Sequence, residues 1–398
     1  MTVAIVLVSF SIGGAEKRYY NLIRHVAVNK KWDITIYINR SLHEALRQRL
    51  GELPDNCKVV YVYRGTGAAC FDRLDFFIYG ASWNRLLPKG LRRYLHFGLY
   101  RLRHLMLKLF GRSYWPKTEG TYDVIHWLFL KPPGRKYSIG PGIVYSIFST
   151  AIRQIARKTN VFTEAVDKNV CFDILSPDLR EGILEVTQGV GAERMLASPC
   201  SFIDYSNTRI ETKKNLIAFS GRLHRIKNPL LFVEAIGMIC EKRDDVEFII
   251  MGHGPLEAEV RSRLEELGVM DRVKVGHESN PVEVLSKAMV FVSLQNINNY
   301  PSQALIEAMA CGCAVVASDE GETHLLVNKN TGVLVNLAAT EVADAVIRMI
   351  DNPEWAQELG VAGRELVTSS HTVERYADHL QKVYQLAMRT KDSISNEG

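Results

Sequence analysis

Two cations close together in one short segment are the residues of this sequence best suited to chemistry. Arg222 and Lys227 lie five residues apart in GRLHRIKN, directly after the apolar run NLIAFS. Gly221 permits the sharp turn that a loop needs after a strand. Two fixed cations at a strand end suit a diphosphate, because they stabilise the negative charge that develops when a bond to it breaks. A solvated basic loop is the competing interpretation, and the position after a strand favours the ligand.

A carboxylate at 307 is the second candidate. It lies in the run NYPSQALIEAMACGCAVVAS, where Ser302 predicts a helix start and Gly312 a helix end. The N-terminus of such a helix favours phosphate, and an acidic side chain one turn further in accepts hydrogen bonds from ribose hydroxyls. Taken alone, Glu307 is explained better as a surface glutamate on an amphipathic helix.

Three weaker candidates are glycine pairs and a histidine. Gly13 and Gly14 follow the first apolar run but lack the G-x-G-x-x-G spacing, which disfavours dinucleotide binding. Gly252 and Gly254 make a tight turn after a strand, and either pocket lining or a plain turn explains them. His126 ends the apolar strand YDVI, where a structural and a catalytic role are about equally supported.

The elements that must position these residues follow an α/β pattern. Apolar runs at 32–38, 57–63, 122–130 and 142–148 follow the first run, and in the second half NLIAFS, VEFIIMG, VKVG, MVFVSL, CAVVAS and TGVLVN alternate with helical segments. This alternation predicts two doubly wound sheets, whose ligands bind at the carboxyl ends of the strands. We expect domains at 1–205 and 206–370, followed by a crossing helix and tail at 371–398.

Composition supports a folded, globular protein. At 398 residues the chain is long enough for two domains, and 47% hydrophobic with 23% charged residues is typical of globular proteins. We find neither a long apolar run for a membrane span nor a signal peptide. Seven scattered cysteines suit reduced thiols in the cytoplasm. No DxD or carboxylate pair stands at a strand end, so no metal is expected.

A basic insertion at about 76–118 stands out from the modest net charge of +5. It has no acidic residue between Phe76 and Thr118, and its leucines recur near helical spacing. Two interpretations of the insertion stay open. It forms either an amphipathic basic helix that lies on an anionic membrane or a helix that packs on the domain with a solvated charged face. Nucleic acid is disfavoured, because no nucleic-acid-binding module accompanies the charge. The membrane or acceptor candidates are Arg92, Arg93, Arg101, Arg103 and Lys108.

The order of these motifs resembles the retaining glycosyltransferases of family four. The resemblance is specific over 215–336 and rests on SGRL, MGHGP, PSQALIEAMACGCAVVAS and TGVLV; in the first half only GGAE and the Asp123 to His126 motif are similar. It implies a GT-B fold, in which two Rossmann-like doubly wound domains face a cleft and a C-terminal helix crosses between them. It also implies a nucleotide-sugar co-substrate and no other cofactor.

The resemblance assigns roles to particular positions. It implies that Arg222 and Lys227 hold the donor diphosphate, that Glu307 binds the ribose, and that His126 lies near the transferred sugar. Gly13, Gly14, Gly252, Gly254, Asn299, Tyr300, Ser302 and Gln303 complete the expected donor site.

Two positions depart from the family pattern. The family commonly has a first glutamate where this chain has Asn299, and a glutamate where it has His324, beside Glu322. Asparagine can donate and accept hydrogen bonds but has no negative charge. We therefore place the recognition of the sugar, but not of the nucleotide, in the segment that departs from the pattern.

The resemblance implies retaining transfer from a UDP- or GDP-sugar to a glycan or lipid-linked glycan, in bacterial envelope polysaccharide synthesis. The expected location is cytoplasmic, with peripheral contact on the inner face of the membrane. Two alternatives stay open: a nucleotide-sugar epimerase on the same scaffold, and a catalytically altered nucleotide-sugar-binding or membrane-adaptor protein. Turnover of a nucleotide sugar without any acceptor would favour the first, and the absence of any nucleotide binding would favour the adaptor.

Overall fold

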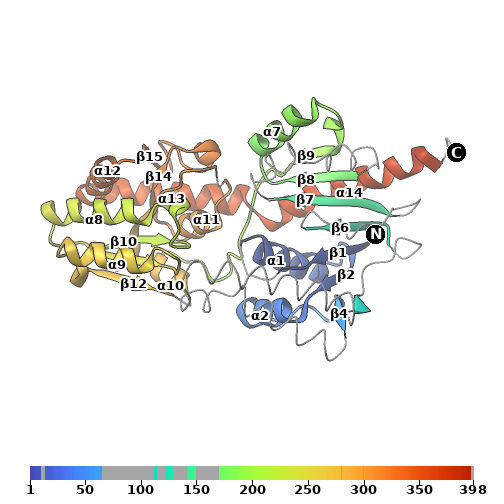
Figure 1. Cartoon of the computed structure of the whole chain (residues 1–398), viewed down its shortest axis with the longest axis horizontal. Helices are drawn as coiled ribbons and strands as arrows, with labels where there is room; N and C mark the ends of the chain where they lie inside the picture. Colours follow the sequence, from blue (N-terminus) through green and yellow to red (C-terminus); the bar gives the residue numbers. More distant parts are fainter. Residues whose placement is uncertain are drawn as a thin grey trace, which may run out of the picture. The chain divides into compact units, whose positions relative to one another are not determined.

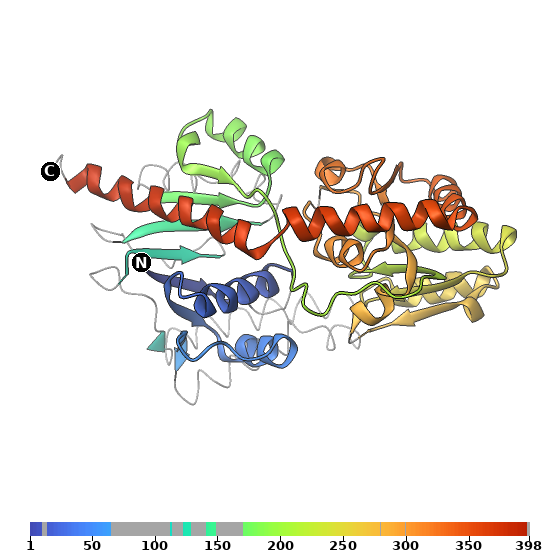
Figure 2. The same cartoon turned by 180° about the vertical axis from the view of Figure 1, so that it is seen from behind.

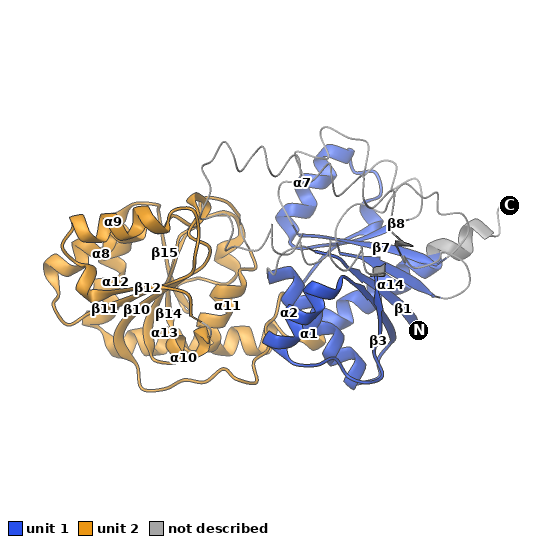
Figure 3. Ribbon diagram, turned by 60° about the horizontal axis from the view of Figure 1, so that its bottom comes forward, with its two compact units in different colours: residues 1–199, 376–398 blue, residues 200–375 orange. Residues whose placement is uncertain are grey.

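The structure is a computed structural model, and it divides into two compact units. Unit 1 comprises Met1–Pro199 and Tyr376–Gly398, and unit 2 is Cys200–Arg375 (Figure 3). The chain therefore leaves unit 1 once and returns to it near the C-terminus. The residues that the structure describes are 1–9, 14–64, 112–113, 122–128, 141–148, 170–278, 280–298 and 300–395.

Unit 1 is built on a seven-stranded parallel sheet with the strand order β3-β2-β1-β6-β7-β8-β9. Its five inner strands are almost wholly buried, as expected for a parallel sheet covered on both faces, whereas the edge strands β3 and β9 are more exposed. They are β1 (Thr2–Leu7), β2 (Asp33–Ile38), β3 (Lys58–Tyr61), β6 (Val124–Trp127), β7 (Gly142–Ile147), β8 (Val170–Ile174) and β9 (Met195–Ala197). A short antiparallel ribbon joins β4 (Tyr63–Arg64) to β5 (Arg112–Ser113).

The described helices of unit 1 cover the two faces of this sheet. They are α1 (Gly14–Val28), α2 (Arg40–Leu50), α7 (Pro177–Thr187), the short η2 (Ala192–Arg194) and α14 (Val373–Ser395), which joins unit 1 from residue 376 onward. Successive strand residues face opposite sides. Ile125 and Trp127 of β6 therefore pack in one cluster with α7, whereas His126 faces α1 and α14.

Unit 2 is a six-stranded parallel sheet with the order β12-β11-β10-β13-β14-β15 (Figure 1). In sequence order this is 3-2-1-4-5-6, the arrangement of dinucleotide-binding folds, and the order reverses between β10 and β13. Ligands bind such sheets in the crevice at that reversal. The strands are β10 (Lys214–Ser220), β11 (Glu247–Met251), β12 (Val273–Gly276), β13 (Ala288–Ser293), β14 (Ala314–Ser318) and β15 (Gly332–Val335).

Two apolar cores lie on the two faces of the second sheet. Phe219 and Ile250 face a core with α8, α9 and α12, whereas Ala218 and Ile249 face a core with α10, α11 and α13. Helix α13 packs beside α11, as the view from behind shows (Figure 2). The helices are η3 (Arg225–Lys227), α8 (Pro229–Lys242), α9 (Glu257–Glu266), η4 (Met270–Arg272), α10 (Pro281–Leu285), α11 (Gln303–Ala310), η5 (Gly321–Leu325), α12 (Ala339–Asp351) and α13 (Pro353–Ser370).

The expectation of two doubly wound α/β sheets is confirmed. Each of the apolar runs singled out in the second half becomes a strand of the second sheet within a residue or two of its expected limits. In the first half the structure adds β8, β9 and α7, which were not anticipated. Their segment follows residues 149–169, which lie outside the described part of the chain.

Candidate functional site

The predicted cations both lie in the loop that follows β10. Arg222 is exposed, and its guanidinium makes no hydrogen bond or ion pair with the described residues. Lys227 is different, because its ammonium donates a hydrogen bond of 2.9 Å to Oε1 of Gln295. Its aliphatic stem passes Gly221, where an added Cβ would lie 3.8 Å from Cδ of the lysine. Burial lowers the pKa of Lys227 from its usual 10.5 to about 8.

Gln295 brings this lysine to the reversal of the strand order. It follows β13, the neighbour of β10, and it is only 6% exposed. Its backbone N–H donates to Oγ of Ser318 at 2.8 Å, and the same hydroxyl donates to the Gln295 carbonyl at 2.8 Å. Ser318 ends β14, so one chain of bonds joins the carboxyl ends of three adjacent strands. Ligands of doubly wound sheets bind at this edge.

Gly252 and Gly254 allow the loop after β11 to approach the loop after β10 closely. A Cβ on Gly252 would lie 1.9 Å from the carbonyl oxygen of Gly221, and one on Gly254 would lie 2.1 Å from that of Leu223. Backbone bonds join the two loops, since the Leu223 N–H donates to the His253 carbonyl at 3.0 Å. These glycines therefore support the shape of the cation-bearing loop, and contact with a ligand remains a prediction for them.

Helix α11 carries Glu307 in its second turn and begins at the same edge of the sheet. The helix follows β13, so its N-terminus lies on the side of the carboxyl ends. Glu307 is half-buried. Ser302 occupies the N-cap position, but its side chain makes no capping hydrogen bond. Gln303 donates to Oγ of Ser201 at 2.6 Å.

The segment before this helix is fastened to the loop after β14. Tyr300 is 8% exposed in the core that α11 shares, and burial followed by the charge of Glu322 raises its pKa to about 12. Nδ2 of Asn298 donates to Oε2 of Glu322 at 3.2 Å, and its Oδ1 accepts from the Tyr300 N–H at 3.1 Å. His324 is exposed and Glu322 is buried. Asn299 lies outside the described residues.

The structure departs most from the expectation at His126. The imidazole is fully buried, with Nδ1 2.7 Å from the Tyr384 hydroxyl and Nε2 2.7 Å from Oγ of Ser146. Burial lowers its pKa to about 4, so it is neutral near pH 7. The expected contact with the transferred sugar is at odds with this position, because both ring nitrogens already have internal partners. His126 instead belongs to a polar network inside unit 1.

That network is centred on a buried carboxylate, Asp173 of β8. It accepts hydrogen bonds from Tyr376 at 2.6 Å and Ser198 at 2.7 Å, and Nε2 of His379 lies 2.9 Å away. Burial alone would raise the pKa of Asp173, but the bond and charge of His379, with the hydroxyl bonds, hold it well below its usual range. Since Tyr376 and His379 belong to α14, the network attaches that helix to the sheet.

The remaining candidates fall at the edge of the described residues or outside them. Gly14 begins α1, while Gly13 is outside. The basic positions Arg92, Arg93, Arg101, Arg103 and Lys108 also lie outside, so their predicted membrane or acceptor role is untested. None of the described helices combines the length and apolar character that a bilayer crossing requires.

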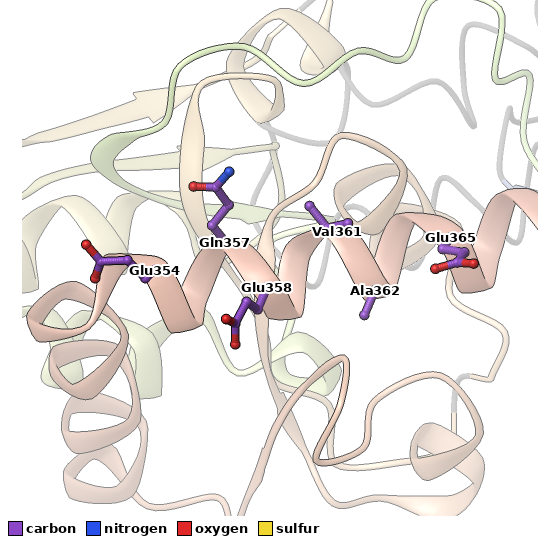
Figure 4. A pocket seen from close by; sticks show the side chains of 6 residues that line it. All are labelled: Glu354, Gln357, Glu358, Val361, Ala362 and Glu365. Carbon is purple, nitrogen blue, oxygen red and sulfur yellow. The ribbon is translucent and has the colours of Figure 1, made fainter.

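A surface pocket in unit 2 lies apart from this site. It runs along α13 and is lined by three glutamates with Gln357, Val361 and Ala362 (Figure 4). Its side chains all come from one helix. The pocket therefore contains none of the residues that the sequence singled out.

Sequence reasoning missed Gln295 and Ser318. Both stand at the ends of strands that were correctly located, and a polar residue directly after a buried strand at the carboxyl edge was the available signal. Their pairing with each other and with Lys227 depends on the strand order, which the sequence alone does not contain.

Comparison with known proteins identifies the second unit. Residues 204–366 match the family described as Glycosyl transferases group 1. This chain carries a glycosyl transferases group 1 domain. The matched region contains the loop after β10, Gln295 and helix α11, so the family assignment covers every part of the candidate site in unit 2.

Curated relatives that are named as glycosyltransferases match part of the chain. One, from Campylobacter jejuni, is N-acetylgalactosamine-N,N'-diacetylbacillosaminyl-diphospho-undecaprenol 4-alpha-N-acetylgalactosaminyltransferase, 30% identical over 32% of this chain and 35% of the relative. Another is the lipopolysaccharide core biosynthesis mannosyltransferase LpsB of Rhizobium meliloti, 27% identical over 45% of this chain and 54% of the relative. The chain thus spans about half, or less, of the length of the curated relatives it matches.

Solved structures extend the likeness to the whole fold. Anabaena HepE, solved in complex with UDP, is 13% identical, with a TM-score of 0.67 over 97% of this chain and 100% of its own. At this identity the likeness shows the fold alone. The fold is GT-B, as the sequence resemblance implied.

Proposed function

We propose that this protein is a retaining glycosyltransferase that moves a sugar from a UDP- or GDP-sugar to a glycan or lipid-linked glycan. The observation that carries the proposal is the Lys227 ammonium, desolvated and held at the reversal of strand order inside a glycosyl transferases group 1 domain. A cation there stabilises the diphosphate as the sugar leaves. The N-terminus of α11 adds its partial positive charge at the same edge.

The donor class is supported by the chemistry of the site and by a solved relative. A diphosphate suits Lys227 and Arg222, and Glu307 suits the ribose hydroxyls of a nucleotide. HepE was solved in complex with UDP-glucose, which is a nucleotide sugar of the proposed class. Retention follows from the resemblance of the motifs to family four.

The acceptor is proposed from the relatives. One matched relative is named for a diphospho-undecaprenol substrate and another for lipopolysaccharide core synthesis. We therefore propose an envelope glycan or its lipid-linked precursor as acceptor, with the protein in the cytoplasm at the inner face of the membrane. Anionic lipid attracts basic side chains by about 1 kcal/mol each.

Neutralising Arg92, Arg93, Arg101 and Arg103 tests the membrane contact. We expect the quadruple alanine variant to remain in the supernatant when it is sedimented with phosphatidylserine vesicles, while the native chain pellets with them. A control variant neutralises four exposed cations of unit 2, Arg225, Lys242, Lys274 and Lys329. Equal pelleting of all three proteins would contradict the membrane contact.

A screen of nucleotide sugars tests the proposed activity. UDP- and GDP-sugars with radiolabelled sugar are incubated with the protein and a bacterial lipid extract, and label in the lipid phase is measured. We expect transfer from donors of one nucleotide class only. Conversion of the donor without any lipid acceptor would favour an epimerase, and the absence of binding to any nucleoside diphosphate would contradict the proposal.

A further inference from the structure

Gln295 is the direct partner of the most important cation in the site. Nζ of Lys227 donates to its side-chain oxygen at 2.9 Å, and the two residues come from the loops after adjacent strands β10 and β13. Lysine has only donors, so the partner atom must be the amide oxygen. The second half of that amide, Nε2, donates to Oγ of Ser293 at 3.3 Å. The oxygen is thereby directed at the ammonium.

The backbone of Gln295 is also fixed. Its N–H and C=O both bond the hydroxyl of Ser318 at 2.8 Å, and both residues are nearly inaccessible to water, at 6% and 2% exposed. The Asn296 N–H then donates to the carbonyl of Ile226 at 3.2 Å, which fastens the two loops together beside the lysine. Gln295 is therefore a rigid support rather than a mobile surface side chain.

The partner's lack of charge is the unusual feature. A cation removed from water is usually paired with a carboxylate, because an uncompensated buried charge is costly. Here the described neighbours of Lys227 supply an amide oxygen and Gly221, and desolvation is the one influence that moves its pKa, to about 8. No carboxylate or second cation among the described residues contributes to the shift in the pKa of Lys227. The charge of the ammonium is held in place without being neutralised.

We propose that Gln295 is a positioning residue of the diphosphate site, which fixes Lys227 with an uncharged oxygen and so leaves its positive charge to an incoming diphosphate. The inference rests on the proposed function, and it identifies the residue that prepares Lys227 to bind the diphosphate. A glutamate at 295 would hold the ammonium equally well, but it would supply the negative charge that the diphosphate otherwise brings.

Substitutions at 295 separate position from charge. Gln295→Glu preserves size and the acceptor oxygen, and Gln295→Met preserves length without an acceptor. The control is Gln357→Glu on α13, in the pocket of the same unit apart from this site, which makes the same change of charge. Calorimetric titration with UDP and with GDP at pH 7 measures affinity, and thermal melting verifies that each variant is folded.

We expect Gln295→Glu to weaken binding of the diphosphate by on the order of 10- to 100-fold and Gln295→Met by about 3- to 10-fold, since bonds to charged groups have this strength. Gln357→Glu should bind as the native chain does. If Gln295→Glu fails to fold, the loss of diphosphate affinity in Gln295→Met tests the proposal. Native affinity in the folded variants at 295 would overturn the proposal.

The ionisation of Lys227 supplies a readout that a purely structural role would not move. Acylation of Lys227 by acetic anhydride, followed against pH by mass spectrometry, reports the fraction of neutral amine without any nucleotide. We expect half-maximal reactivity near pH 8 in the native chain and in Gln357→Glu, and at higher pH in Gln295→Glu. An unchanged profile in Gln295→Glu would contradict the contact. Absence of UDP and GDP binding in the native chain would contradict the proposed function instead. The acylation profile would still test the contact between Lys227 and Gln295.

Discussion

The candidate site depends on a few polar residues whose roles differ in how far the sequence could define them. Lys227 was found from its spacing to Arg222 and its position after a strand, and the structure adds its partner. Gln295 could not be found that way, because its role depends on the adjacency of β10 and β13. The role of His126 was left open between structure and catalysis for a related reason. The end of an apolar strand does not show which face a side chain takes or which helix covers it.

Glu307 offers a test at this scale. If it accepts hydrogen bonds from the ribose, Glu307→Gln should weaken the binding of UDP or GDP by about 10-fold, in line with the strength of bonds to a charged acceptor. The same change should have little effect on the 2′,3′-dideoxy form of that nucleotide. Calorimetry of the four combinations gives a coupling energy. Equal losses with both nucleotides would show that Glu307 acts elsewhere.

The elements of the second unit were predicted well because each strand is a short apolar run bounded by turn residues. In the first unit β8, α7 and β9 were not predicted, because Asp173 interrupts the apolar run of β8 and β9 has only three residues. The attachment of α14 was likewise beyond the sequence. The sequence predicted a helix here, but it does not show that the hydroxyls of Tyr376 and Tyr384 bond Asp173 and His126.

This attachment makes the stability of unit 1 depend on pH. The pKa of His126 is about 4 in the folded chain and about 6.5 when unfolded, so below pH 6.5 the unfolded state takes up a proton that the folded state does not. Stability should therefore fall by about 1.4 kcal/mol per pH unit, or about 3 kcal/mol between pH 6.5 and 4. His371, whose pKa is also about 4, lies in unit 2 and gives that unit a loss of the same sign. Asp173 stabilises the fold above its unfolded pKa, and this contribution is lost only at lower pH.

Urea denaturation across this pH range measures the effect. His126→Asn should reduce the dependence of the unfolding free energy on pH by the equivalent of about one proton. The same substitution at the exposed His324 should leave this dependence unchanged. NMR titration of the His126 imidazole provides an independent measurement if the variant is poorly folded. An imidazole that titrates near pH 6.5 in the native protein would contradict the buried network.

The whole molecule consists of two units, of which the second is one continuous segment. Residues 200–375 contain both apolar cores of the six-stranded sheet and the complete Lys227, Gln295 and Ser318 chain. A domain with its own core can fold alone. We expect a fragment of residues 200–375 to unfold cooperatively in a thermal melt followed by circular dichroism.

The same fragment should bind UDP or GDP within about 10-fold of the native affinity, because the proposed diphosphate and ribose contacts lie within it. It should transfer no sugar, since it lacks the first unit and with it the acceptor candidates of the basic insertion at 76–118. A folded fragment without nucleotide affinity would show that residues outside 200–375 hold the donor.

The central claim is that a diphosphate binds the desolvated ammonium at the reversal of strand order in unit 2. Calorimetric titration of the native chain, Lys227→Ala and the exposed control Lys242→Ala with UDP and GDP, and with the corresponding nucleosides, tests it most directly. We predict that Lys227→Ala weakens the binding of the nucleoside diphosphate by on the order of 100-fold and leaves the binding of the nucleoside unaffected. Lys242→Ala should change neither affinity. Native diphosphate affinity in a folded Lys227→Ala protein would contradict the account.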